Sequence, residues 1–218
     1  MNLFIGPRGS WDVGGQAKVT AAVGGAARGN ETLAASLAEA HRAVDLGVRS
    51  LLIGDLGTLA LLGAEKAAGR LPSDLVLKTS VLMPLTNAAT ARVYADVGAT
   101  SLNVSTDLPI AHIAEIRAAV DLPIDMYVEV PDDQGGAVRF YDVPELVRVA
   151  APVYVKLGVR NAPNIYPTGE HLEATAVALG RERVRRTALV LRLLAELDPE
   201  LAKSVGSKDS ADLALPRA

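Results

Sequence analysis

Short apolar runs alternate along this chain with stretches that have helical spacing. The runs end in polar residues and lie at 2–6, 51–57, 75–80, 101–106, 125–130 and 153–158. Runs of this length between turn residues are typical of buried strands, and a repeated strand–helix unit builds a parallel sheet. The pattern therefore predicts an α/β fold with a TIM-barrel-like (β/α) sheet.

Six strands are evident, whereas a complete TIM barrel has eight. Glycine weakens a strand interior, so Gly24-Gly25 argues against a further strand near 18–26. We expect an incomplete barrel, or one with fewer than eight strands, formed by residues 1–200 as a single domain. Residues 201–218 are expected to be a flexible tail. Helices are expected at about 31–45, 57–68, 88–97, 109–120, 144–150 and 170–197, with a short one at 16–23.

Composition narrows the class of protein. Half of the 218 residues are hydrophobic, which allows a large core. The net charge of −3 gives no electrostatic footprint for nucleic acid, and the arginines at 181–186 are expected on a solvated helix face. The absence of cysteine excludes disulfides and cysteine-bound iron–sulfur clusters. No apolar run reaches about 18 residues and no signal peptide is evident, so we expect a soluble, cytoplasmic protein without a membrane partner.

Two lysines lie inside predicted strands, near their carboxyl ends. Catalytic residues of (β/α) barrels gather at those ends. Lys78 and Lys156 are unusual in strands covered on both faces, because burial of a charged amine is costly. A desolvated lysine has a lowered pKa and can form a Schiff base or bind a carboxylate or phosphate. We predict both as catalytic residues.

Carboxylates supply further candidates. Glu129 shares a strand face with Asp125 and Tyr127, and it can be a general base, a metal ligand or the partner of a strand lysine. Asp55 follows a buried strand, where it is either a catalytic carboxylate or the N-cap of the next helix. Asp132 and Asp133 precede two glycines and leave a divalent metal open, although their spacing matches no specific metal motif.

Polar residues at the strand ends and in the long loops are predicted to bind substrate. The loop 158–169 is rich in hydrogen-bond donors and stiffened by prolines, which suits recognition. No Ser-His-Asp order, H-E-x-x-H sequence or Gly-rich phosphate fingerprint is present. The predicted substrate-binding residues are Asn87, Asn103, Ser105, Arg139, Arg160, Asn161, Asn164 and Tyr166.

The segments IGDLGTLALL (53–62), LKTSVLMPLTNAATARVYADVGATSLNVSTDL (77–108) and IAEIRAAVDLPIDMYVEV (113–130) resemble the collagenase-like peptidases of family U32. Asp55, Thr86, Asn87, Gly98 and Ser105 fall on positions of the family pattern. The resemblance implies a barrel-like (β/α) fold and a peptidase activity. It also points to members linked to hydroxylation of transfer RNA or quinone precursors, several of which use cysteine-bound clusters. This chain has no cysteine and so no such cluster.

These observations favour a hydrolase acting on a peptide-like or small polar substrate. One alternative is a lysine- or metal-dependent lyase or isomerase of a small carbonyl or phosphorylated compound. Another is a non-catalytic binding protein on a barrel scaffold. An incomplete barrel leaves open strand edges that a second copy could cover, so a homo-oligomer is also expected.

Overall fold

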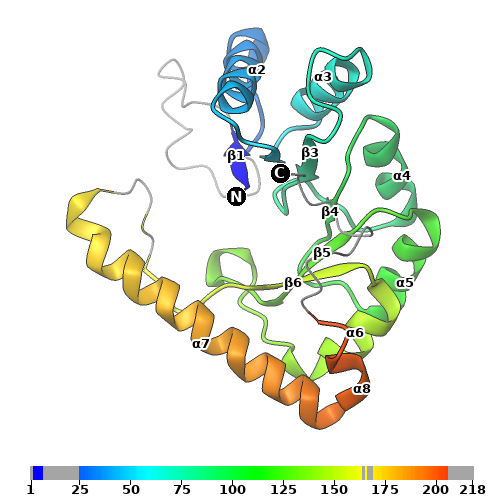
Figure 1. The fold of residues 1–218 in the computed structure, drawn as a ribbon, viewed down its shortest axis with the longest axis vertical. Coiled ribbons are helices and arrows are strands. Elements are labelled where there is room, and N and C mark those ends of the chain that lie inside the picture. The colour runs from blue at the N-terminus through cyan, green and yellow to red at the C-terminus, as the bar shows by residue number, and fades with distance from the viewer. Residues whose placement is uncertain (1, 7–24, 164, 166–168, 206–218) are drawn as a thin grey trace.

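The computed structural model describes residues 2–6, 25–163, 165 and 169–205 (Figure 1). Strands and helices alternate along the chain, as the sequence pattern predicts. The strands are β1 (Leu3–Ile5), β2 (Ser50–Ile53), β3 (Val76–Thr79), β4 (Leu102–Asn103), β5 (Ile124–Glu129) and β6 (Val153–Leu157). The helices are α2 (Gly29–Asp45), α3 (Leu56–Ala67), α4 (Ala88–Asp96), α5 (Ile110–Ala119), α6 (Val143–Ala150), α7 (Glu173–Leu197) and α8 (Pro199–Ala202), with short 3-10 helices at Asp132–Gln134, Phe140–Asp142 and Glu170–Leu172.

All six strands are parallel to their neighbours. They form two sheets, β1-β2-β3 and β4-β5-β6. A bridge between Lys78 and Ser101 joins β3 to the start of β4, and the Thr79 amide donates to the Ser101 carbonyl at 3.0 Å. The strands therefore follow chain order across the fold. Helices α2 to α6 line one side of the strands, and α7 runs along another (Figure 1).

The α/β class with parallel strands is confirmed, and a closed barrel is not formed by the described strands. No pairing joins β1 to β6 within that part of the chain. The short helix expected at 16–23 lies outside the described residues. The long connection after β5 contains two of the 3-10 helices.

The two faces of the strands differ in chemistry. The helix-facing side is apolar: Leu51, Leu77, Leu102, Ile124 and Met126 are all fully buried in one core. The opposite side, called here the concave face, carries the charged strand residues. The register places Phe4, Leu52 and Lys78 in one cross-strand row on this face. Alternation along the strands thus directs the core residues to the helices and Lys78 away from them, in one row with Phe4 and Leu52.

Helix ends follow local signals at most positions. Gly47 and Gly98 adopt positive φ values directly after the C-caps of α2 and α4, as glycine permits. The helix expected from about residue 31, which would make Asn30 its N-cap, begins earlier: Asn30 lies inside α2, whose N-cap is Arg28. Leu201, expected in the flexible tail, belongs to α8 and packs against the core. Residues 206–218 lie outside the described part.

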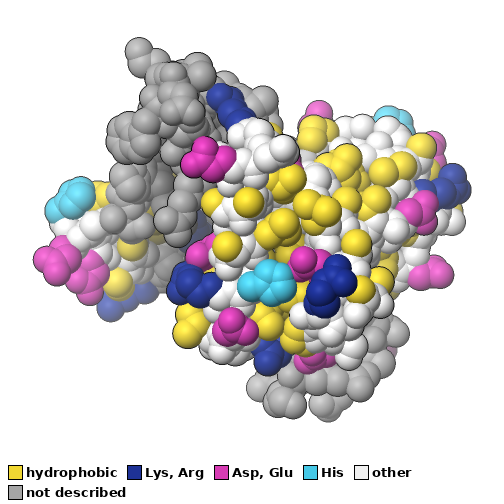
Figure 2. All heavy atoms as spheres, turned by 90° about the horizontal axis from the view of Figure 1, so that it is seen from above, with side chains coloured by type: hydrophobic (Ala, Val, Ile, Leu, Met, Phe, Trp, Pro, Cys, Tyr) yellow, Lys and Arg dark blue, Asp and Glu magenta, His cyan; other side chains and the backbone are white. Residues whose placement is uncertain are grey.

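The surface gives no sign of a large basic patch over the described residues seen in Figure 2, where acidic and basic side chains are interspersed with apolar ones. The longest described helix, α7, has exposed apolar residues at Val177, Val184 and Leu191, but arginines and glutamates interrupt them. Within the described residues, no helix combines the length and apolarity that spanning a membrane requires.

Asp55 is the N-cap of α3, so its replacement by Ala should destabilise the fold. One carboxylate oxygen accepts from the Thr58 amide at 2.8 Å and the other from the Ala27 amide at 3.1 Å. We expect a loss of about 1–2 kcal/mol in urea unfolding. The exposed cap of α4, Asn87, accepts only from the Thr90 amide, so Asn87→Ala should cost less. An equal or greater cost for Asn87→Ala would contradict this account.

Candidate functional site

A buried ion pair forms the centre of the concave face. Lys78 Nζ on β3 lies 2.8 Å from Asp125 Oδ1 on β5, and the two side chains are 6% and 4% exposed. The other carboxylate oxygen of Asp125 accepts from Ser101 Oγ at 2.8 Å. The Lys78 ammonium also lies 4.1 Å from the ring centre of Tyr154 on β6. Each carboxylate oxygen of Asp125 therefore accepts a hydrogen bond, and the Lys78 ammonium contacts both an anion and an aromatic face.

The second lysine has a neutral partner. Lys156 Nζ on β6 donates to Asn103 Oδ1 at 2.7 Å and lies 4.4 Å from the ring centre of Tyr127. Asn103 is fully buried, and its amide nitrogen donates to the Thr79 carbonyl at 2.5 Å. That second bond fixes the amide, so its oxygen faces the Lys156 amine.

Burial lowers the pKa of both lysines. For each, loss of hydration is the largest cause, and the charge of Asp125 opposes it. Lys78 has the further support of its hydrogen bond to Asp125, while the charge of Lys156 lowers the pKa of Lys78. Lys156 has no hydrogen bond to a carboxylate among the described residues, since its acceptor is the Asn103 amide. Of the two buried amines, that of Lys78 is thus the one held by a hydrogen-bonded carboxylate.

Glu129 lies at the end of β5 and contacts α7 rather than a lysine. It is fully buried, and Oε1 accepts from the Arg160 amide at 3.0 Å and pairs with Arg186 of α7. Its other oxygen, Oε2, has no hydrogen-bond partner among the described residues. The sequence left open a strand lysine as the partner of Glu129. In the structure this partner is Arg186 of α7. Asp125 takes the lysine.

The loop residues predicted to bind substrate hold the loops to one another. Arg160 Nε pairs with Asp132 at 3.1 Å, and the Asn161 amide donates to the same carboxylate. Arg139 pairs with Asp142 at 2.8 Å and donates to the Leu108 carbonyl at 2.7 Å. The positions of Asn164 and Tyr166 lie outside the described residues.

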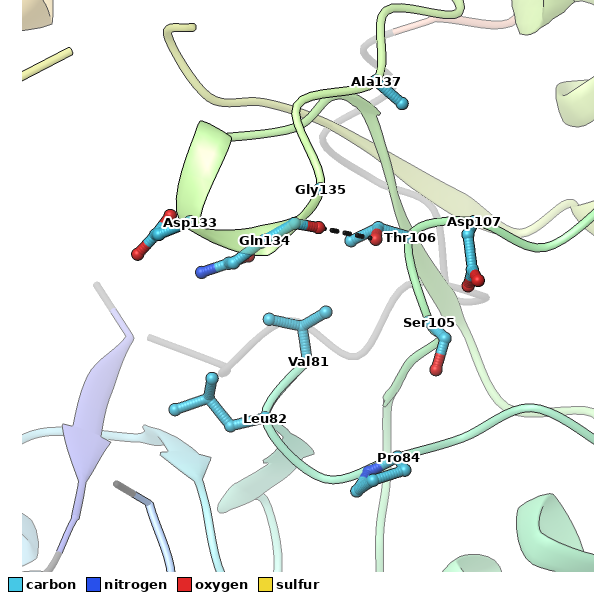
Figure 3. A pocket seen from close by; sticks show the side chains of 10 residues that line it. All are labelled: Val81, Leu82, Pro84, Ser105, Thr106, Asp107, Asp133, Gln134, Gly135 and Ala137. Atoms are coloured by element: carbon cyan, nitrogen blue, oxygen red, sulfur yellow. Dashed lines mark hydrogen bonds between the residues drawn. The ribbon is translucent and has the colours of Figure 1, made fainter. Parts of the chain in front are cut away.

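A cavity of about 360 Å³ lies over the carboxyl ends of β3, β4 and β5 (Figure 3). We call it the rim cavity. Ser105, one of the predicted substrate-binding residues, lines it. Asp55 and Asn87 do not line it, and both act as helix caps. The structure thus brings Lys156 and Asn103 into direct contact and places Lys78 nearby, paired with Asp125.

No metal cluster is evident in this part of the fold. Among residues 2–6, 25–163, 165 and 169–205, no three His, Asp or Glu side chains lie together in an arrangement suited to a metal ion. Asp132, which the sequence left open as a ligand of a divalent metal, accepts hydrogen bonds from Arg160 and the Asn161 amide. These contacts lower the pKa of its carboxyl group, with the Asn161 amide as the main cause.

Sequence reasoning missed several members of this network. Asp125 and Tyr127 could have been found from the alternation that placed them beside Glu129 on one strand face. Ser101 and Tyr154 follow from strand register, which the sequence does not supply. Arg186 was assigned to a solvated helix face, and no local signal marks its reach to Glu129.

The fold and its polar concave face define a parallel α/β protein with a lysine-containing interior. Comparison with known proteins adds the family: the model of peptidase family U32 matches residues 15–129, so the chain belongs to that family. A search of curated proteins finds no match. Among solved structures, the chain is similar to the U32 peptidase Mk0906, with 14% identity, a TM-score of 0.40 and 79% of this chain covered. The match spans 60% of that protein's chain.

Proposed function

We propose that this chain is an enzyme that hydrolyses a peptide-like or small polar carbonyl compound, with Lys156 as its reacting amine. The observation that carries the proposal is the unequal partnering of two buried lysines. Lys78 is paired with a carboxylate and Lys156 with a neutral amide. Neighbouring titratable groups whose surroundings separate their protonation are typical of acid–base pairs in active sites.

The chemistry follows from that difference. In this proposal Lys78 is the protonated lysine, because Asp125 gives its ammonium group a counter-charge. Lys156, whose pKa is lowered mainly by loss of hydration, provides an unprotonated amine near neutral pH more readily than an exposed lysine does. In hydrolysis, this amine takes a proton from the attacking water. Membership of peptidase family U32 supports a peptide-like substrate.

A second candidate function uses the same amine as a nucleophile. A neutral lysine near a second cation attacks a carbonyl carbon and loses water to form an imine, as lyases of keto acids require. Loss of hydration at Lys156, which lowers the pKa of this amine, favours this alternative. Reduction by borohydride separates the two reactions, because only an imine is trapped as a stable mass increase on Lys156.

The test is ligand-dependent thermal stability of the wild type and Lys156→Met. Short peptides, keto acids and phosphorylated metabolites are screened, and a ligand at 100 times its Kd stabilises the wild type by about 2.7 kcal/mol. We expect Lys156→Met to lose this shift. Lys203→Met, which removes an exposed lysine at the C-cap of α8, should keep the stabilisation by the ligand. A ligand that stabilises wild type and Lys156→Met equally would overturn the proposal, as would the absence of any stabilising ligand.

A further inference from the structure

The two buried lysines reach past a neighbouring strand to acceptors that stand side by side. Lys78 on β3 reaches past β4 to Asp125 on β5. Lys156 on β6 reaches past β5 to Asn103 on β4. Asn103 and Asp125 are partners in the register of β4 and β5. Asparagine and aspartate are alike in size and shape but differ in charge, so one cross-strand pair of residues gives the two lysines different acceptors.

The Asn103 side chain has its orientation imposed by Thr79 of β3. Asn103 Nδ2 donates to the Thr79 carbonyl at 2.5 Å, and a carbonyl oxygen can only accept, so the amide nitrogen must lie on that side. The Asn103 backbone amide donates to the Thr79 hydroxyl at 3.0 Å, and both residues are fully buried. Oδ1 is thereby turned toward Lys156 Nζ, 2.7 Å away.

A neutral acceptor holds a lysine amine in either protonation state. An ammonium group and a neutral amine both have N–H donors, so the Asn103 oxygen accepts from Lys156 before and after a proton leaves. A carboxylate, in contrast, favours the charged form strongly. Asn103 therefore keeps Lys156 Nζ in one place without pairing it with a charge.

The titratable and charged groups on this part of the concave face come from three strands and from α7. They are Lys78 of β3, Asp125, Tyr127 and Glu129 of β5, Tyr154 of β6, and Arg183 and Arg186 of α7. Loss of hydration lowers the pKa of Lys156, and the charge of Asp125 opposes this effect. Asn103 adds a hydrogen bond to this balance and no charge of its own.

We infer that Asn103 is the positioning residue of Lys156: its amide, fixed by Thr79, holds the amine in place while the amine exchanges its proton. This inference rests on the proposed function and adds the residue that distinguishes Lys156 from Lys78. Asn103 was predicted from the sequence to bind substrate. In this assignment it acts through Lys156 instead.

The pH dependence of acetylation at Lys156 tests the inference. The full chain is treated briefly with acetic anhydride across a pH series, and the peptide that contains Lys156 is quantified by mass spectrometry. Asn103→Leu removes the acceptor and keeps a similar volume. A hydrogen bond from a charged group is stronger than one from a neutral group, so its loss should lower the pH midpoint of acetylation by about 1–2 units.

Thr79→Val is the matched control, because it disturbs the same two strands but retains the carbonyl that orients the Asn103 amide. We expect it to leave the midpoint of Lys156 unchanged. The exposed Lys203 should keep its midpoint in both variants. An unchanged Lys156 midpoint in Asn103→Leu would overturn the inference, and so would an equal shift in Thr79→Val.

A measurement on the wild type decides the matter if Asn103→Leu does not fold. The side-chain amide signal of Asn103 in nuclear magnetic resonance should titrate with the midpoint of Lys156, since Oδ1 accepts from that amine. A signal that does not follow Lys156 contradicts the assignment. The ligand screen with Lys156→Met tests the proposed function separately. If the midpoint shifts as expected but no ligand distinguishes Lys156→Met from the wild type, the proposed function fails and the role of Asn103 stands.

Discussion

Asp125→Asn is expected to lower the free energy of unfolding by about 3–5 kcal/mol, because it leaves the buried ammonium of Lys78 without a counter-charge. The substitution preserves shape and retains an acceptor for Ser101, so packing changes little. In a domain of this size, such a loss lowers the midpoint of thermal unfolding by roughly 6–20 °C. Urea unfolding at neutral pH, followed by circular dichroism, measures the effect.

The double variant Lys78→Met/Asp125→Leu is the control for this prediction. Removing both charges replaces an ion pair by apolar groups of similar size, which is often neutral or stabilising. We expect the double variant to recover most of the stability lost in Asp125→Asn. If Asp125→Asn unfolds within about 0.5 kcal/mol of the wild type, the pair is not desolvated as the structure describes.

Gly63→Ala is expected to cost about 3–4 kcal/mol, because the backbone of α3 meets the turn after α4 with no room for a side chain. A Cβ at residue 63 would overlap the carbonyl oxygen of Val97 and lie 3.0 Å from its carbonyl carbon. The obstacle is backbone, which cannot move aside as a flexible side chain does. Differential scanning calorimetry of the variant measures the loss.

Gly180→Ala gives the matched comparison for that substitution. Gly180 lies inside α7, and a Cβ there would meet no atom within 4 Å. Alanine is the better helix former, so this change should stabilise the fold by about 0.5–1 kcal/mol. The two Gly→Ala variants therefore shift the unfolding temperature in opposite directions. If both variants lose a similar amount of stability, the close backbone approach at Gly63 and the gain in helix propensity at Gly180 do not explain the results.

Much of the fold was predictable because local patterns carry it. Continuous apolar runs identify strands buried on both sides, and each of the six predicted strands is present. Gly47 and Gly98 mark helix ends because they adopt backbone angles that other residues avoid. The start of α2 was predicted too late because Asn30 is a good capping residue. Such a residue gives the same sequence signal when it lies one position inside the helix.

The site was only partly predictable because partner choice depends on register. Alternation alone places Asp125, Tyr127 and Glu129 on one face of β5. It cannot decide which carboxylate meets Lys78. That choice follows from the register of β4 and β5, where Asn103 stands opposite Asp125, and from an irregularity in β5–β6 pairing between Tyr127 and Glu129. Arg186 then reaches Glu129 from α7, a contact set by the docking of a helix.

The row of Phe4, Leu52 and Lys78 has a consequence for how the fold responds to salt. Phe4 is 44% exposed, whereas Lys78 is buried and paired with Asp125. The concave face therefore presents hydrocarbon to solvent near β1 and keeps the charges of β3 and β5 away from water. Dissolved ions screen exposed charges strongly and buried charges much less, so the attraction between Lys78 and Asp125 should change little with ionic strength.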